Sequence, residues 1–172
     1  MAETEARAEP RFGAADLPGP DVSIVVTLFN EVASLDELYR RTVAALAPGP
    51  RAFELIFVDD GSTDGTFAAL ERLHRDDGRV RAVRFKRNFG QHPAMHAGLA
   101  RARGDIVVTM DGDLQNAPED IPLLVGAVDS GYDVASGCTR PMPASAPSGS
   151  SATSGSTRRC TRACRGRAGR SS

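Results

Sequence analysis

The chain has 172 residues, 41% of them hydrophobic, and a formal net charge of −1 at pH 7, so its length and composition suit one globular domain. The charge is uneven, because residues 1–137 carry 14 basic and 22 acidic side chains, a net charge of −8. An acidic body argues against non-specific nucleic-acid binding, which depends on Lys and Arg neutralising phosphates, and its natural charged partner is a metal ion.

Cysteine and hydropathy patterns exclude two further classes of protein. The three cysteines all lie at or after Cys138, so the part expected to fold has no disulfide framework. No stretch approaches the roughly 18 apolar residues of a transmembrane helix, and the N-terminus lacks the apolar core of a signal peptide. As written, the chain is expected to be soluble and cytoplasmic, and its oligomeric state stays open.

The predicted elements alternate along the chain. Residues 1–20 lack apolar periodicity and predict a disordered leader. Short apolar runs rich in β-branched residues then predict buried strands at 22–28, 53–58, 80–85 and 106–110, and a fifth strand beginning at 132.

Helices are predicted between these strands. Ser34 and Glu37 resemble a capping box that opens the first helix. A second follows the turn 60–63, and a third covers 91–103 and is closed by Gly104. Pro118 begins the fourth helix, whose apolar residues fall at i, i+3, i+4 and i+7: Ile121, Leu124, Val125 and Val128.

This alternation predicts an α/β fold with a mostly parallel sheet and helices on both faces, because parallel strands need crossover connections. Residues 21–137 are expected to form this domain. Ligands of such sheets bind at the carboxyl ends of the strands, and polar motifs follow each of the first four predicted strands.

The segment 138–172 has a different composition. It contains no Val, Ile, Leu, Phe, Tyr, Asp or Glu and therefore has too little apolar surface to fold. The change begins within the fifth predicted strand. A reading-frame shift in a GC-rich gene would produce this amino-acid composition, and a native basic tail is the alternative.

An acidic motif follows the fourth predicted strand. Asp111, Asp113 and Gln115 occupy alternate positions, so their oxygens can point the same way. Oxygen ligands in this number suit Mg²⁺ or Mn²⁺, which bind substrate phosphates in many enzymes. The alternative is an acidic turn that caps the following helix.

Two further motifs predict contacts with a nucleoside. Asp59 and Asp60 follow the second strand, where a carboxylate can accept hydrogen bonds from a base or a ribose, whereas Asp64 fits local turn chemistry. Residues 27–31 would form the wall of the site that faces these carboxylates, with Glu31 near the nucleoside. For Phe29, the alternative is a packing role alone.

The motif at 87–90 precedes a helix, so Arg87 and the backbone N–H groups would face a phosphate. A solvated basic pair is the alternative. His92 and His96 have metal-compatible spacing but no visible third ligand, which favours helix packing. The glycine motif of dinucleotide-binding enzymes, G-x-G-x-x-G, is absent after the first strand.

Together, the motifs VSIVVTLFNE at 22–31, VDDGSTDGT at 58–66, RNFG at 87–90 and TMDGDLQN at 109–116 resemble the family 2 glycosyltransferases of GT-A fold. The closer resemblance, over residues 21–137, is to enzymes that use polyprenyl phosphates in cell envelope synthesis. These include the dolichol-phosphate mannosyltransferases and the undecaprenyl-phosphate aminoarabinose transferases.

The resemblance implies roles for particular residues. Asp111, Asp113 and Gln115 would hold the metal and the donor diphosphate, with Asp113 as the catalytic residue. The implied donor-binding residues are Thr27, Phe29, Asn30, Glu31, Asp59, Asp60, Arg87, Asp111 and Asp113. Relatives usually have Pro at 27, Tyr at 29 and Ala at 112, and none of these departures removes a ligand.

The implied reaction is inverting transfer of a sugar from a UDP- or GDP-sugar to a lipid phosphate at the cytoplasmic face of a membrane. One alternative is a hydroxyl acceptor, which requires an acidic base beyond residue 137, and the chain has none there. The other is an inactive fragment that binds the nucleotide-sugar without turnover.

Overall fold

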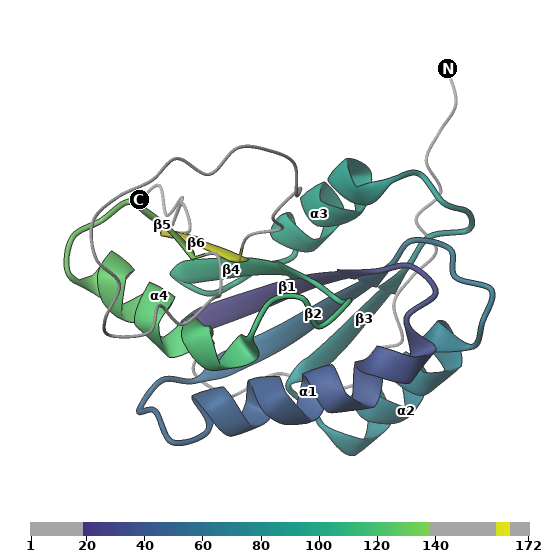
Figure 1. Cartoon of the computed structure of the whole chain (residues 1–172), viewed down its shortest axis with the longest axis horizontal. Helices are drawn as coiled ribbons and strands as arrows, with labels where there is room; N and C mark the ends of the chain where they lie inside the picture. Colours follow the sequence, from purple (N-terminus) through teal and green to yellow (C-terminus); the bar gives the residue numbers. More distant parts are fainter. Residues whose placement is uncertain (1–18, 138–160, 166–172) are drawn as a thin grey trace, which may run out of the picture.

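The computed structural model describes residues 19–137 and 161–165 (Figure 1). Within these ranges the elements follow one another in the order β1 (Val22–Leu28), α1 (Val32–Leu46), β2 (Phe53–Asp59), α2 (Thr66–Asp76), β3 (Val80–Arg84), α3 (Gln91–Leu99), β4 (Ile106–Asp111), the 3₁₀ helix η1 (Pro118–Asp120), α4 (Ile121–Asp129), β5 (Val134–Gly137) and β6 (Thr161–Arg165). None of the helices in the described ranges is long and apolar enough to span a bilayer.

The strands form one mixed sheet in the order β3-β2-β1-β4-β6-β5. Strand β1 pairs in parallel with β2 and β4, and β2 pairs in parallel with β3. The carboxyl ends of these four strands therefore meet at one edge, as the alternation of elements predicts. Strand β6 lies antiparallel between β4 and β5.

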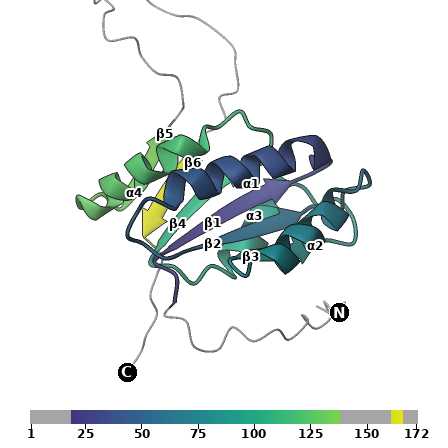
Figure 2. The ribbon, with the colours of Figure 1, turned by 90° about the horizontal axis from the view of Figure 1, so that it is seen from below.

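Helices cover both faces of the sheet (Figures 1 and 2). Alternate residues of β1 belong to the cores on the two opposite faces of the sheet. Ile24 and Val26 pack with α1, α2 and α4, whereas Val25 packs with Ala94 of α3. This period of two is what a strand buried on both faces requires. The predicted apolar face of α4 is confirmed, since Ile121, Leu124, Val125 and Val128 are all buried.

The start of the first helix differs from the prediction. Helix α1 begins at Val32, and no side chain caps it in the predicted way. The Ser34 hydroxyl lies 2.7 Å from Glu31 Oε2 and 3.0 Å from the Gly112 carbonyl oxygen instead. Asp64 accepts a hydrogen bond from the Val32 N–H at 3.1 Å, so a distant loop satisfies this helix end.

The predicted end of the third helix is also wrong. Helix α3 ends at Leu99, four residues before the predicted end, and the Ala100 N–H closes it on the His96 carbonyl oxygen. Gly104 lies against β1, where its N–H donates to Ser23 Oγ at 2.8 Å. Gly104 therefore allows its segment to approach β1 closely and does not end a helix.

Strand β6 lies within the segment whose composition predicts no fold, so that prediction is wrong for residues 161–165. The other tail residues, 138–160 and 166–172, lie outside the described residues, as do residues 1–18 of the predicted leader. Strand β6 forms without large apolar side chains, because β4 and β5 supply its backbone hydrogen bonds and Ala163 is fully buried between them. Composition underestimates such a strand, since its pairing depends on the backbone.

The buried carboxylate of Glu54 links the amino-terminal ends of β1 and β2 to the segment before β4. Glu54 is 3% exposed, and it accepts hydrogen bonds from Ser23 Oγ at 2.7 Å, from Arg103 Nη2 at 2.8 Å and from the Arg103 N–H at 2.9 Å. Burial raises the pKa of Glu54, but the hydrogen bonds from Ser23 and Arg103 outweigh burial and hold the pKa below its ordinary value of 4.5.

We expect Glu54→Gln to lower the free energy of unfolding by about 1–3 kcal/mol at neutral pH. Because the folded-state pKa is lowered, the contribution is fully present above the unfolded-state pKa and is lost as the pH falls through the folded value. Urea unfolding should therefore show the difference from the unchanged chain shrinking below pH 4.5. The control is Glu37→Gln, which breaks the exposed Arg40 pair and should cost less than about 1 kcal/mol. An equal cost of Glu54→Gln at neutral and acid pH would contradict this role.

Candidate donor-binding site

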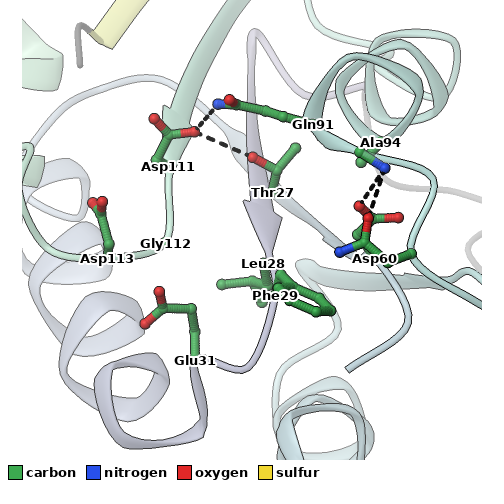
Figure 3. A pocket seen from close by; sticks show the side chains of 12 residues that line it. Thr27, Leu28, Phe29, Glu31, Asp60, Gln91, Ala94, Asp111, Gly112 and Asp113 are labelled. Carbon is green, nitrogen blue, oxygen red and sulfur yellow. Dashed lines mark hydrogen bonds between the residues drawn. The ribbon is translucent and has the colours of Figure 1, made fainter. Parts of the chain in front are cut away.

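A pocket of about 310 Å³ opens where the carboxyl ends of β1 and β4 meet the start of α3 (Figure 3). It contains four carboxylates, and none of the described residues that line it is Lys or Arg. The lining residues are Thr27, Leu28, Phe29, Glu31, Asp60, Asn88, Gly90, Gln91, Ala94, Asp111, Gly112 and Asp113.

Asp111 ends β4 and is nearly buried, with 9% of its surface exposed. Its Oδ1 accepts a hydrogen bond from Thr27 Oγ1 at 3.3 Å and another from Gln91 Nε2 (Figure 3). Thr27 and Asp111 are paired residues of the neighbouring strands β1 and β4, which brings the Thr27 hydroxyl to the Asp111 carboxylate. Two donors on one oxygen fix the orientation of this carboxylate.

Asp113 lies two residues further on, at the side of the pocket where Glu31 also lies (Figure 3). Its Oδ1 accepts a hydrogen bond from the Gln115 N–H at 3.1 Å. Leu114 has a φ of 58°, a left-handed conformation that turns the chain sharply. The Gln115 side chain is exposed and does not line the pocket.

Asp60 lies on the other side of the pocket, below α3 (Figure 3). Its two oxygens accept hydrogen bonds from the backbone N–H groups of Phe89, at 2.8 Å, and Gly90, at 2.9 Å. Asp60 therefore holds the loop that leads into α3. Asn88 and Gly90 of this loop also line the pocket.

Asp59 does not line the pocket. It is fully buried, its Oδ1 accepts the Ser62 N–H at 3.1 Å, and its Oδ2 lies 3.7 Å from Arg84 Nε. Asp59 ends β2 and Asp60 follows it, and of these adjacent carboxylates only Asp60 lines the pocket.

The wall at 27–31 is formed by residues with different tasks. Phe29 and Glu31 line the pocket, and Phe29 is 46% exposed. Asn30, with a φ of 56°, instead joins two loops: its N–H donates to Ser62 Oγ and its Oδ1 accepts from the Thr63 N–H, both at 2.9 Å.

Asp64 serves the turn chemistry that the sequence predicts. Its Oδ1 accepts from the N–H and the hydroxyl of Thr66, at 3.0 and 2.6 Å. Desolvation raises the pKa of Asp64, but the hydrogen bonds from Thr66 and Val32 outweigh it and lower the pKa. The side chain stays at the surface, outside the pocket.

Arg87 also lies outside the pocket lining. Its guanidinium stacks on the Phe89 ring, 4.8 Å from the ring centre. His92 and His96 are exposed on α3. Among the residues that the structure describes, no three His, Cys, Asp or Glu side chains form a group that could hold a metal by themselves.

Sequence reasoning did not assign Gln91 to the site, although its amide contacts Asp111 directly. The only signal was its place as the first residue of a helix that follows a polar motif. Its direction toward β4 depends on how α3 crosses the sheet, which a single sequence does not specify.

The family model described as glycosyl transferase family 2 matches residues 23–149, more than half of the chain. The chain belongs to this family. A family 2 relative, the undecaprenyl-phosphate 4-deoxy-4-formamido-L-arabinose transferase of Pseudomonas aeruginosa (strain LESB58), is 52% identical over 114 residues, which are 66% of this chain and 34% of the relative. The chain thus spans about a third of the length of the curated relatives it matches.

Solved glycosyltransferase structures share the fold of this family 2 chain, a GT-A fold. The mannosyltransferase PcManGT of Pyrobaculum calidifontis, in complex with GDP-Man and Mn²⁺, matches with a TM-score of 0.51 and 28% identity over 60% of this chain and 30% of that one. The glucosyl-3-phosphoglycerate synthase of Mycobacterium tuberculosis, in complex with Mn²⁺, UDP and glucosyl-3-phosphoglycerate, matches with a TM-score of 0.52 and 27% identity over 69% and 43% of the two chains.

Proposed function

We propose that the pocket is the donor site of a metal-dependent inverting glycosyltransferase, which moves a sugar from a UDP- or GDP-sugar to a polyprenyl phosphate. The relative from Pseudomonas aeruginosa is named for an undecaprenyl-phosphate acceptor. The related structures hold GDP-Man or UDP together with Mn²⁺. An acceptor of this kind lies at a membrane surface, and the cytoplasmic face is the proposed side.

The charge of the pocket is the observation that carries this proposal. Glu31, Asp60, Asp111 and Asp113 line it without any Lys or Arg among the described lining residues. A diphosphate would be repelled here unless a cation lay between the two anions, since close like charges are costly where water is partly excluded. A divalent metal resolves this conflict.

The residues fit Mg²⁺ or Mn²⁺. These ions take oxygen ligands, and Mg²⁺ in particular is commonly held by one or two carboxylates together with substrate phosphates and waters. Asp111 and Asp113 supply two carboxylates in one pocket, so a complete cage of protein ligands is unnecessary. Gln115, which lies outside the lining, stays a proposed third ligand.

The rest of the pocket suits a nucleoside. The Phe29 ring offers an apolar surface for the base, and the Glu31 carboxylate would accept hydrogen bonds from the ribose hydroxyls. The Ser34 hydroxyl orients this carboxylate at 2.7 Å. Asp59 is proposed to act only indirectly, through the loop at Ser62. Asn30 likewise shapes the wall at 27–31. Arg87, which lies outside the pocket lining, is proposed to interact with the donor's phosphates.

Little acid–base chemistry is needed from the chain. The bound metal would act as a Lewis acid that stabilises charge on the leaving diphosphate. Asp113 is the proposed catalytic residue because it would hold that ion beside the departing group. A phosphate monoester acceptor is already an anion at neutral pH, its second pKa being about 6, so no protein base is assigned.

A donor-turnover assay tests the proposal. The full chain is mixed with Mn²⁺, undecaprenyl phosphate in detergent micelles and either a UDP-sugar or a GDP-sugar, and the release of nucleoside diphosphate is measured. We expect release that requires both the metal and the lipid phosphate. Asp113→Ala should abolish it, whereas Asp36→Ala, at an exposed ion pair with Arg72, should not. Donor binding without lipid-dependent release would overturn the transfer step and leave a donor-binding chain.

A further inference from the structure

A continuous series of contacts crosses the pocket from Asp60 to Asp111. Asp60 holds the Phe89 and Gly90 N–H groups at 2.8 and 2.9 Å. Gly90 is followed directly by Gln91, the first residue of α3. The Gln91 amide then donates to Asp111 Oδ1. The two sides of the pocket are therefore linked through one short loop.

We propose that Gln91 is a positioning residue that sets the carboxylate of Asp111, and that Asp60 acts on the same carboxylate through the loop at 88–90. This rests on the proposed function, because it assigns Asp111 to the metal. Gln91 occupies Oδ1 together with Thr27, and both donors limit rotation of the carboxylate. Its angle relative to Asp113 is thereby fixed before a metal arrives.

The same contacts assign a new task to Asp60. Both of its oxygens accept backbone N–H groups, so Asp60 anchors the loop, and each oxygen keeps a further lone pair for a hydrogen bond from the donor base. Outer hydrogen-bond partners of metal ligands typically change metal affinity by about 10- to 100-fold when removed. Gln91 and Thr27 are such partners of Asp111, and Asp60 acts one step further out, through the loop that it holds.

Mg²⁺ and Ca²⁺ respond differently to a misplaced carboxylate. Mg²⁺ demands nearly ideal octahedral geometry, whereas Ca²⁺ tolerates irregular ligands. Loss of the Gln91 amide should therefore weaken Mg²⁺ more than Ca²⁺. A general loss of structure would weaken both ions alike, so the ratio of the two affinities separates positioning from folding.

The experiment measures free Mn²⁺ by electron paramagnetic resonance in the presence of UDP or GDP, with Mg²⁺ and Ca²⁺ as competitors. We expect Gln91→Ala to weaken Mn²⁺ and Mg²⁺ binding by about 10-fold or more, with a smaller loss for Ca²⁺. Asp60→Asn should shift the ratio of Mg²⁺ to Ca²⁺ affinity in the same direction. His92→Ala, at the exposed next residue of α3, should change neither.

The outcomes distinguish failure of the proposed function from failure of the role proposed for Gln91. If the unchanged chain binds no Mn²⁺ with either nucleotide, the proposed function fails and this inference fails with it. If the unchanged chain binds Mn²⁺ and Gln91→Ala binds it equally well, only the inference is overturned. An equal loss for Mg²⁺ and Ca²⁺, or a lower urea midpoint that accounts for the loss, also overturns positioning.

Discussion

Asp113→Ala and Asp111→Ala are each expected to abolish the metal-dependent stabilisation of the chain by UDP or GDP. A nucleotide at 100 times its Kd stabilises the folded state by about 2.7 kcal/mol. For a chain of this size, that raises the Tm by about 5–10 °C. The rise should require Mn²⁺, because the metal offsets the repulsion between the diphosphate and the pocket carboxylates.

The measurement is a thermal scan of each variant with nucleotide alone, with Mn²⁺ alone and with both. Asp36→Ala is the matched control, because it also removes one negative charge but lies in an exposed ion pair, 2.8 Å from Arg72. It should keep the full Mn²⁺-dependent rise. A full rise in Asp113→Ala would remove this residue from the metal site.

Gly61→Ala is expected to cause the largest loss of stability in the loops around the pocket, about 2–5 kcal/mol. Gly61 has a φ of +73°, and a Cβ there would lie 2.5 Å from the Arg87 carbonyl carbon and 2.7 Å from the Asn88 nitrogen. Both neighbours are backbone atoms, so the loop at 88–90 must move. Donor binding should weaken with it, because this loop lines the pocket.

Gly65→Ala separates the two causes of that loss. Gly65 also has a positive φ, +95°, but a Cβ there would meet nothing within 4 Å. Only the backbone strain remains, so we expect a cost of about 1–2 kcal/mol. Urea unfolding measures both variants, and equal costs for Gly61→Ala and Gly65→Ala would show that the close approach to Arg87 is unimportant.

The order of elements was predictable because each strand and helix carries its own local signal. The apolar run of β1 is buried along its whole length, and the apolar spacing of α4 matches its buried face. The place of β6 was not predictable, since Thr161–Arg165 pairs through backbone groups and has little apolar character. Local periodicity carries no information about such pairing.

The site was predictable where residues end neighbouring parallel strands. Thr27, Asp111 and Asp113 come together for that reason. Side-chain direction was harder to predict: Asp59 is buried outside the pocket lining, Arg87 stacks on Phe89, and Gln115 faces solvent. These directions depend on loop geometry, which the sequence motifs alone do not fix.

The most direct test of the central claim is calorimetric titration of UDP and of GDP into the full chain, with and without Mn²⁺. We expect saturable binding of one of the two nucleotides that strengthens at least tenfold with Mn²⁺, equivalent to about 1.4 kcal/mol. Binding that is equally strong without metal would contradict the metal-bridged donor site. The absence of binding by either nucleotide to the folded chain would contradict the donor site itself.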